Sequence, residues 1–379
     1  MLVYLDNSAT TQPSKAVVNA VASSMREGYY NPSALYAPAL AAEQQMSACR
    51  EAIAGKVNAK QVFFTSGGTE ANNLAIFGML KSLRGFGKVL FSAGEHPSVR
   101  ETCKQTAKMG FTPEEIPLDQ NGLVNLSALE TMLDNQVRMI CVMQVNNETG
   151  AVQPIEEVSK LRNKLCPDAM FHVDGVQGFL RIPMDMVGLQ VDSYALSGHK
   201  IHAGKGVGAL ALGGRGRLTP IMFGGGQEKG FRSGTENTPG IAGLRAAIES
   251  FPARHEMRKL KLRLYERQKS DIDGLVVNGP PPESASAAPH ILNVSFMSVR
   301  AETMLHALEG EGIFVGNGSA CSSRKKQVSH VLSAMNCGVK QAESAIRFSL
   351  SPYTTQAEID IASDACVRQY ELLKNFVRR

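Results

Sequence analysis

A turn rich in glycines and hydroxyl groups, residues 65–73, follows the short apolar stretch 62–64. Glycines let a backbone come close to a ligand, and the N–H groups at a helix start bind phosphate, here with the Thr69 hydroxyl as a further donor. A plain strand-to-helix turn explains the same residues, because the spacing matches neither a Walker A loop nor a dinucleotide-binding fingerprint. The turn indicates phosphate binding only in combination with other groups.

Two charged residues come just past the ends of apolar stretches farther along the chain. Asp174 follows residues 169–173, and Lys200 follows residues 193–196. Ligands of open α/β sheets bind at the carboxyl ends of strands, where desolvation favours the neutral lysine amine that forms Schiff bases. Taken singly, Asp174 is explained as a helix cap and Lys200 as a surface lysine. Combined with a phosphate-binding turn, they supply the three contacts that pyridoxal phosphate (PLP) requires.

Cys321 lies in a stretch rich in glycine and serine, residues 315–326, with three cations just downstream of it. Nearby cations favour the thiolate form of a cysteine, which is the nucleophile. A buried, inert cysteine is the alternative, but it fits poorly with so polar a setting. The pattern predicts a mobile loop that carries a nucleophilic thiol.

The composition is that of an ordinary globular protein, with 43% hydrophobic and 20% charged residues and a formal charge of +5. The positive charge is not concentrated in one run, which argues against direct nucleic-acid binding. The start of the chain does not resemble a signal peptide, and no apolar run is long enough for a membrane span. The seven cysteines form no CxxC pair. We therefore expect a cytoplasmic protein.

Short apolar strands alternate with helical stretches between residues 13 and 246, the pattern of a largely parallel sheet covered by helices on both faces. Strands are expected at residues 62–64, 88–92, 139–144, 169–173, 193–196 and 207–212, and helices at 71–81, 98–109, 127–133 and 155–164. This region is predicted to be a large α/β domain.

The remaining sequence predicts a smaller α+β unit. A long charged helix is expected at residues 243–270, interrupted at Pro252, and a loop at 279–289. A strand at 290–297, a helix at 301–309 and a strand at 346–350 follow. We predict a large domain formed by residues 13–246, and a small domain formed by residues 1–12 and 247–379 that carries Cys321.

Taken together, these segments resemble the cysteine desulfurases of the NifS/IscS type, within the class V aminotransferase group of fold-type I PLP enzymes. The resemblance rests on residues 4–11, 31–33, 65–73, 95–96, 146–150, 172–174, 197–200, 224–228, 232–235, 318–321 and 347–350. It implies a large domain with a mostly parallel seven-stranded sheet, a smaller α+β domain and PLP as the cofactor.

The resemblance also implies a role for each matching residue. Lys200 binds the cofactor covalently and moves protons, Asp174 keeps the pyridine nitrogen protonated, and His96 stacks on the ring. The cofactor phosphate is held by Gly68, Thr69, Ser197 and His199, with Thr235 from the partner subunit of a homodimer. Gln177 contacts the phenolic oxygen of the cofactor. Asn147 and Arg347 bind the substrate carboxylate, and Asn147 also lies beside the cofactor. Taken one by one, His96 fits a loop, Asn147 a turn and Arg347 a surface ion pair.

The implied reaction removes sulfur from L-cysteine, leaving L-alanine and a persulfide on Cys321. The sulfur then passes to an iron–sulfur scaffold or a thiolation carrier. This chain is expected to hold no resident metal, although Cys321 could bind an iron–sulfur cluster transiently during transfer. The alternatives are another class V enzyme, a selenocysteine lyase or an aminotransferase, and a non-catalytic sulfur-assembly scaffold. The chain departs from the family pattern at Tyr36, at His202 and at residues 351–353, but no departure removes a catalytic group.

Overall fold

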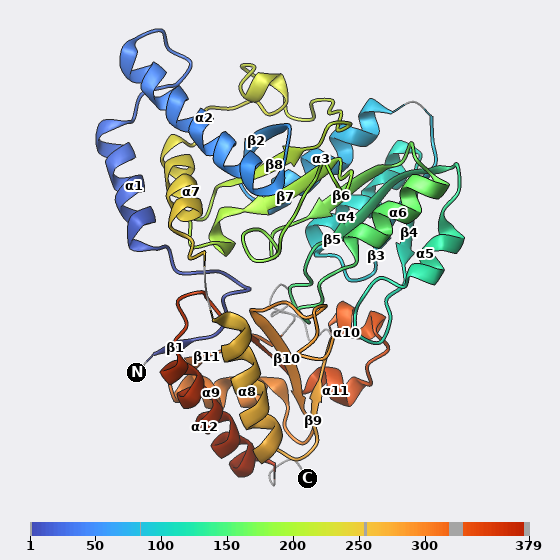
Figure 1. Cartoon of the computed structure of the whole chain (residues 1–379), viewed down its shortest axis with the longest axis vertical. Helices are drawn as coiled ribbons and strands as arrows, with labels where there is room; N and C mark the ends of the chain where they lie inside the picture. The colour runs from blue at the N-terminus through green and yellow to red at the C-terminus, as the bar shows by residue number, and fades with distance from the viewer. Residues whose placement is uncertain (1, 84, 254–255, 318–328, 375–379) are drawn as a thin grey trace.

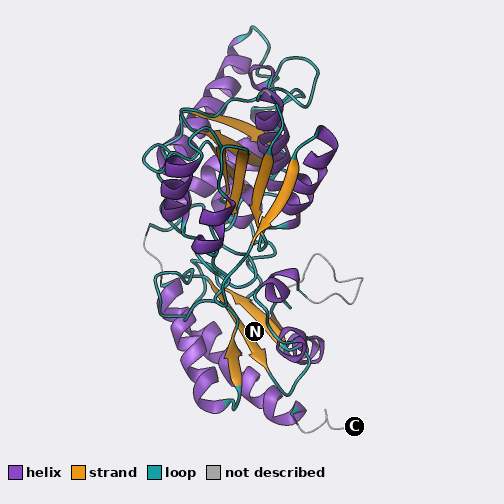
Figure 2. Ribbon diagram, turned by 90° about the vertical axis from the view of Figure 1, so that its right-hand side faces the viewer, coloured by secondary structure: helices purple, strands orange, loops and turns teal. Residues whose placement is uncertain are grey.

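The computed structural model describes residues 2–83, 85–253, 256–317 and 329–374, so Cys321 lies outside the described residues. The molecule has a larger α/β part and a smaller part built from the N-terminal residues and the C-terminal third of the chain (Figure 1). Figure 2 shows the two parts stacked end to end, each with strands of its own. The predicted α/β class with a smaller second unit is confirmed.

The large part is built on a seven-stranded sheet in the order β2-β8-β7-β6-β5-β3-β4. Its strands are β2 (Gln61–Thr65), β3 (Lys88–Ser92), β4 (Thr112–Ile116), β5 (Val137–Met143), β6 (Met170–Asp174), β7 (Ser193–Ser197) and β8 (Gly208–Leu212). All neighbouring pairs are parallel except those that involve β8. The sheet is therefore mostly parallel, as predicted.

Helices cover both faces of this sheet, because successive strand residues point to opposite sides. Phe63 packs with helices α3 (Gly68–Ser82) and α4 (Pro97–Gln105). Val62 and Phe64 pack in the other layer, which includes residues of α2 (Ala37–Val57), α6 (Ile155–Leu165) and α7 (Thr238–Ser250). Helices α1 (Lys15–Glu27) and α5 (Leu126–Met132) complete the large part.

The edge strand β4 was not predicted from the sequence. It contains Pro113 and two glutamates, Glu114 and Glu115, which are unusual in strands. β4 pairs only with β3, and an edge strand tolerates proline because one side of its backbone needs no ladder partner. The position at the edge is thus the reason that the propensity rule failed here.

The prediction of a helix from residue 243 to residue 270 that is interrupted at Pro252 is confirmed for the interruption, but its start was placed too late. α7 begins earlier, at Thr238, because the Asn237 side chain accepts a hydrogen bond from the backbone N–H of Gly240 and Pro239 occupies the first turn. The second helix, α8 (Met257–Asp271), is a separate element. The Asn-Thr-Pro start signal at residues 237–239 was present in the sequence but was not used.

The small part combines two sheets with the helices α8, α9 (Ala301–Gly310) and α12 (Gln356–Leu373). Its strands form the antiparallel order β12 (Ala345–Ser349), β10 (Ile291–Phe296), β9 (Leu275–Val277), and β1 (Val3–Tyr4) pairs in parallel with β11 (Ile313–Phe314). Two short helices, α10 (His330–Ala334) and α11 (Val339–Glu343), flank them. Val3 and Leu5 are fully buried in the same core cluster as α8 and α12, so the first residues of the chain pack on its last third.

The strand directions bring three chain segments to one edge of the large sheet. β2 and β7 are both antiparallel to β8, and β6 is parallel to β7, so all three strands end on the same side. Thr65, Asp174 and Ser197 are the last residues of these strands. This edge is where ligands bind in open α/β sheets. No helix in the described part of the chain is long and apolar enough to cross a membrane.

Candidate active site

A cavity of about 370 Å³ lies at the carboxyl edge of the large sheet. Most of the residues predicted for the site line it: Gly68, Thr69, His96, Asn147, Asp174, Gln177, Ser197, His199, Lys200 and Arg347. They come from separate segments of the large part and, through Arg347, from the small part. The cavity is therefore closed from both parts of the molecule, and Ser8 and Ala9 contribute to it from the N-terminal segment.

The glycine turn after β2 forms one wall of this cavity. Gly67 precedes α3 with φ of 156°, a conformation that side chains disfavour, and a Cβ on Gly68 would come within 2.7 Å of Val176. The first N–H groups of a helix have no partner within the helix and attract anions. The start of α3 is thus a cradle that fits a phosphate group, with the Thr69 and Ser197 side chains beside it.

Asp174 is held in place by the fully buried side chain of Asn72. The Asn72 amide donates to the Asp174 carboxylate and to Ser98 Oγ, both at 2.8 Å. Its oxygen lies 2.9 Å from His172 Nε2, and burial lowers the pKa of His172 to about 3, so this neutral ring donates from Nε2. The backbone N–H of Val176 donates to the other Asp174 oxygen. The carboxylate is therefore fixed in the cavity by uncharged donors.

His96 is the N-cap of α4, and its ring lines the cavity. The backbone N–H of Ser98 donates to His96 Nδ1 at 3.1 Å, which leaves the ring proton on Nε2. Burial lowers the pKa of His96, so the ring is neutral at pH 7. A neutral ring in this position is suited to stacking on a flat, electron-poor ligand.

Lys200 lies in the short 3₁₀ turn Gly198–Lys200 that follows β7. Its Nζ donates to the carbonyl groups of Ser8 and Ala9, at 2.6 and 2.7 Å. Thr11 braces the same turn, because its N–H donates to the His199 carbonyl and its hydroxyl accepts from the His202 N–H. The N-terminal segment thus determines where the lysine amine lies.

The donor set of the cavity fits PLP. Gln177 donates from Nε2 to the Ser8 carbonyl, and its buried Oε1 has no hydrogen-bond partner among the described residues. Burial, followed by the nearby Lys200, lowers the pKa of His199 to about 4, so that its ring is neutral beside the glycine turn. An amine, a carboxylate, an anion cradle and an orphaned amide oxygen lie around one cavity, and these are the groups that a pyridine aldehyde phosphate can use.

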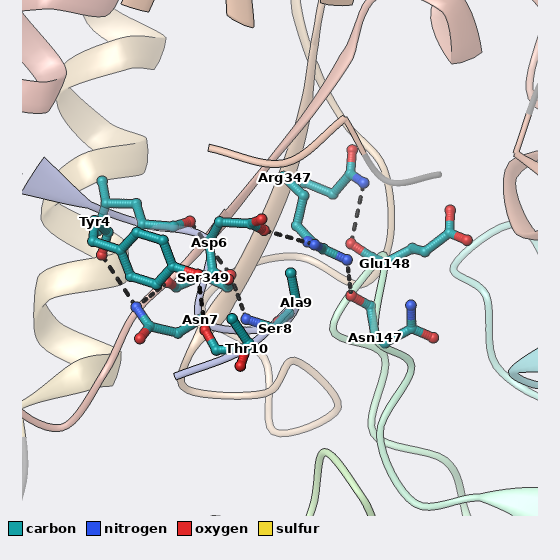
Figure 3. A network of polar contacts seen from close by, with 12 residues as sticks. Tyr4, Asp6, Asn7, Ser8, Ala9, Thr10, Asn147, Glu148, Arg347 and Ser349 are labelled. Atoms are coloured by element: carbon teal, nitrogen blue, oxygen red, sulfur yellow. Dashed lines mark hydrogen bonds and ion pairs between the residues drawn. The ribbon is translucent and has the colours of Figure 1, made fainter. Parts of the chain in front are cut away.

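Arg347 on β12 brings a buried cation to the other side of the cavity. The residue is 1% exposed. Its Nη1 donates to the Asn147 carbonyl at 2.9 Å, and its Nη2 pairs with the Asp6 carboxylate at 2.7 Å (Figure 3). A planar guanidinium can bind a carboxylate through two parallel hydrogen bonds. The Arg347 guanidinium is therefore a group of the kind that can receive the carboxylate of a small acid.

Glu148, the residue after Asn147, is a second buried acid at this end of the site. Burial raises its pKa to about 7, although the Ser329 hydroxyl donates to its carboxylate and Arg347 is nearby. Ser329 is the first described residue after the gap at residues 318–328. On the other side of that gap, Gly316 exchanges two backbone hydrogen bonds with Arg347. Both flanks of the segment that contains Cys321 are thus bonded to residues of the site.

The lining of the cavity does not include two of the predicted residues, for different reasons. Thr235 is exposed and does not line it. Cys321 lies outside the described residues. The described part of the chain holds no cluster of three or more His, Cys, Asp or Glu side chains arranged for a metal ion.

The fold and the site define a class of enzymes that the comparisons with known proteins identify. The family model of aminotransferase class-V matches residues 3–361, so the chain belongs to this PLP-dependent family. Within it, the chain belongs with the cysteine desulfurases. It is 37% identical to the cysteine desulfurase IscS of Dictyoglomus turgidum, over 98% of this chain and 95% of that protein.

Solved structures show the same likeness. A NifS-like protein superposes with a TM-score of 0.88 and is 32% identical, over 98% of this chain and 99% of that one. The structure of SspA in complex with cysteine superposes with a TM-score of 0.82 and is 30% identical, over 93% of this chain and 100% of that one. The predicted resemblance to the NifS/IscS type is confirmed.

Sequence analysis missed several residues that hold the site together. Asn72, Asp6 and Glu148 lie within the segments that carried the family resemblance, but no role was assigned to them. Ser98 gave no signal, because a serine early in a helix is common. A polar residue such as Asn72, placed where helical spacing predicts a buried face, was the available clue.

Replacing Asn72 should destabilise the protein. Asn72→Ala removes one hydrogen bond from each of the buried groups Asp174, Ser98 and His172, so we expect the free energy of unfolding to fall by about 3 kcal/mol in urea titrations. The matched control is Asn73→Ala, because that partly exposed amide donates only to the Thr69 carbonyl in the described structure. A loss of about 1 kcal/mol or less is expected there. Equal losses in the two variants would contradict the proposed role of Asn72.

Glu148 should make stability depend on pH. Its carboxyl keeps its proton up to about pH 7 in the folded chain but titrates near 4.5 when unfolded, so the folded state binds more protons in between. Its stabilising contribution is therefore lost as pH rises through this window. Relative to Glu148→Gln, the wild type should lose about 3 kcal/mol of unfolding free energy between pH 4.5 and 8. Glu157→Gln on the exposed face of α6 is the control, and equal pH slopes in wild type and Glu148→Gln would refute this assignment.

Proposed function

We propose that this chain is a PLP-dependent cysteine desulfurase that converts L-cysteine to L-alanine and leaves a persulfide on Cys321. One observation carries the proposal: Lys200, Asp174 and Arg347, from three distant segments, line the same cavity. The amine, the acid and the carboxylate receptor are the groups that PLP chemistry on an amino acid requires. The family membership of the chain supports this activity.

The cofactor would bind with its aldehyde at Lys200 and its pyridine nitrogen at Asp174. The phosphate would sit at the start of α3, held by Gly68, Thr69, Ser197 and His199, with His96 stacked on the ring and Gln177 at the phenolic oxygen. When bound, PLP withdraws electrons from the substrate's α-carbon. Asp174, fixed by Asn72, would keep the pyridine nitrogen protonated so that the ring can accept them.

The side chains of this protein would bind the substrate, transfer its proton and accept its sulfur. Arg347 and Asn147 hold the substrate carboxylate, and the Lys200 amine takes and returns the α-proton. The Cys321 thiolate attacks the substrate sulfur, so that a sulfur–sulfur bond forms while the Cβ–sulfur bond breaks. The released electron pair stays on the carbon skeleton, and protonation there gives L-alanine. No outside oxidant is needed, because the oxidation of sulfur to the persulfide level is balanced by the reduction of the β-carbon to the methyl group of alanine.

The flanks of residues 318–328 support this role for Cys321. Gly316 is hydrogen-bonded to Arg347, and Ser329 is hydrogen-bonded to Glu148. The described residues on either side of the segment are therefore bonded to groups at the carboxylate end of the cavity. These hydrogen bonds attach both ends of the segment that contains Cys321 close to the place where the substrate amino acid would bind.

The alternatives within the family are a selenocysteine lyase and an aminotransferase. An aminotransferase needs a keto acid to regenerate its cofactor, so formation of alanine without one would exclude it. A non-catalytic scaffold would have no reason to keep a buried Asp174 and a buried Arg347 around one cavity, since buried charges are costly. The SspA structure holds cysteine, which supports cysteine as the substrate here.

Further parts of the proposal concern partners and location. We propose a homodimer in which Thr235, exposed in the single chain, reaches the phosphate of the neighbouring site. The sulfur acceptor would be an iron–sulfur scaffold or a thiolation carrier. All six described cysteines are free thiols, which supports a reducing compartment such as the cytoplasm.

The division of the chain into domains is also a proposal. Residues 13–246 would form the cofactor-binding domain, and residues 1–12 with 247–379 the small domain. A core cluster that joins Val3 and Leu5 to residues of 257–370 supports this division. Val331, Leu332 and Met335 pack instead with the core of the large part, so the two units share a contact there.

Loss of the thiol should separate sulfur transfer from cofactor binding. Cys321→Ser should keep the cofactor absorbance but lower alanine formation from L-cysteine by at least about 100-fold, because the hydroxyl is a far weaker nucleophile. Mass spectrometry should find the added sulfur mass in the wild type and in the control Cys337→Ser, but not in Cys321→Ser. Sulfur transfer that survives in Cys321→Ser would exclude this residue as the acceptor.

Loss of the amine should abolish the covalent cofactor link. After borohydride reduction, peptide mass spectrometry should locate the cofactor on the peptide that contains Lys200, and Lys200→Ala should show no such adduct. Lys108→Ala, a change at an exposed lysine beyond α4, should retain it. An adduct of unchanged yield in Lys200→Ala would overturn the assignment of the cofactor lysine.

A further inference from the structure

Arg347 is a buried cation whose hydrogen bonds are only partly used. Its side chain is 2% exposed, whereas that of its partner Asp6 is 20% exposed. A guanidinium has five N–H donors, and the described structure uses Nη1 for the Asn147 carbonyl and Nη2 for Asp6. Arg347 Nε has no partner among the described residues. Donors therefore remain for one further carboxylate.

Asp6 holds the guanidinium from the side of the N-terminal segment, opposite the Asn147 carbonyl, as Figure 3 shows. That segment is itself fixed to β12, because the Asn7 N–H donates to the Ser349 carbonyl and the Ser8 N–H donates to Ser349 Oγ. An anchor of this kind restricts the orientation of the guanidinium plane. It also offsets the charge of a cation that burial would otherwise destabilise.

The same short segment also holds the lysine amine. The carbonyls of Ser8 and Ala9 accept from Lys200 Nζ, two and three residues after Asp6. The Arg347 guanidinium and the Lys200 amine are thus both hydrogen-bonded to the same short stretch of chain, residues 6–9. An α-amino acid presents its amine and its carboxylate on one carbon, so the spacing of these two anchors matters for binding it.

Gly316 approaches the ion pair closely. A Cβ at this position would come within 2.7 Å of Asp6 Oδ1 and 2.8 Å of Arg347 Nη2. Gly316 is also paired to Arg347 through two backbone hydrogen bonds. A side chain here would push the carboxylate and the guanidinium apart, so Gly316 offers a second way to disturb the same contact.

We propose that Asp6 is a positioning residue for substrate recognition, which orients Arg347 so that its remaining donors receive the carboxylate of an α-amino acid. This inference rests on the proposed function, because it takes Arg347 as the receptor of the substrate carboxylate. It adds a residue that acts through Arg347 and sets the preference for substrates that have both an amine and a carboxylate.

The test measures ligand binding by the change in cofactor absorbance, with L-alanine, L-cysteine and cysteamine, which lacks the carboxylate. Asp6→Ala should weaken L-alanine binding and raise the KM for L-cysteine by at least about tenfold, with kcat changed by less than about twofold. Asp6→Asn, which keeps an oxygen acceptor for Nη2, should weaken both several-fold less. Cysteamine binding should stay within about twofold of the wild type in each variant.

Gly316→Ala should reproduce the pattern of Asp6→Ala if the ion pair is the cause. Asp360→Ala is the matched control, since it breaks ion pairs between α8 and α12 away from the cavity and should leave all three ligands unaffected. Combining Asp6→Ala with Arg347→Ala should add little to Arg347→Ala alone, because the two residues act through one contact.

Two results would overturn the inference. One is L-alanine binding that is unchanged or tighter in Asp6→Ala, which would make Asp6 a bystander or a competitor of the substrate. The other is an equal loss of cysteamine binding, which would indicate general damage to the site. If the wild type instead forms no alanine or persulfide but binds L-alanine in an Asp6-dependent way, the proposed function fails and the positioning role stands.

Discussion

The site depends on the cost of burying charged groups. Asp174 and Arg347 are almost completely removed from water, and each is stable only because polar partners surround it. Asp174 has the Asn72 amide and the Val176 N–H, whereas Arg347 has the Asp6 carboxylate and the Asn147 carbonyl. Because these partners come from helices, loops and the N-terminal segment, the surrounding fold is needed to keep both charges in place.

The two charges are compensated in different ways, which matches the different ligands expected at them. Asp174 receives only neutral donors, so its negative charge remains available to a protonated ring nitrogen. Arg347 has one anionic partner that is partly open to solvent, and keeps donors for a further carboxylate. The charge of Asp174 is thus free to pair with a permanently bound cofactor. The charge of Arg347 is only partly neutralised, so it can pair with a substrate that binds and leaves.

Local pattern predicted the sheet and the reactive residues at its edge. Strands β3, β5, β6, β7 and β8 were placed within about two residues, because their apolar runs are bounded by turns. Asp174 and Lys200 were recognisable because the first ends such a run and the second lies three residues beyond one. Edge strand β4 was missed, since Pro113 and two glutamates hide it, and the start of α7 was misplaced by five residues.

The remaining site residues depend on contacts that no local pattern encodes. Asn72 is one polar residue on an otherwise apolar helix face, and its role becomes visible only when two other segments, β6 with His172 and Asp174 and α4 with Ser98, come together around it. His202 and Ser351, both departures from the family pattern, lie 149 positions apart in sequence, yet His202 Nε2 is 3.0 Å from Ser351 Oγ. In space these two departures are one contact.

The contacts of the N-terminal segment also constrain the order in which the chain folds during synthesis. Ser8 is synthesised well before its partner Ser349, which is 341 positions later. The N-terminal segment, which contacts both the Lys200 amine and Arg347, can therefore be fixed to β12 only after residue 349 has been synthesised. Contacts of such long sequence separation form late, because closing the intervening chain costs entropy. A growing chain can thus complete the seven-stranded sheet, whose last strand ends at Leu212, well before Ser349 is available to fix the N-terminal segment.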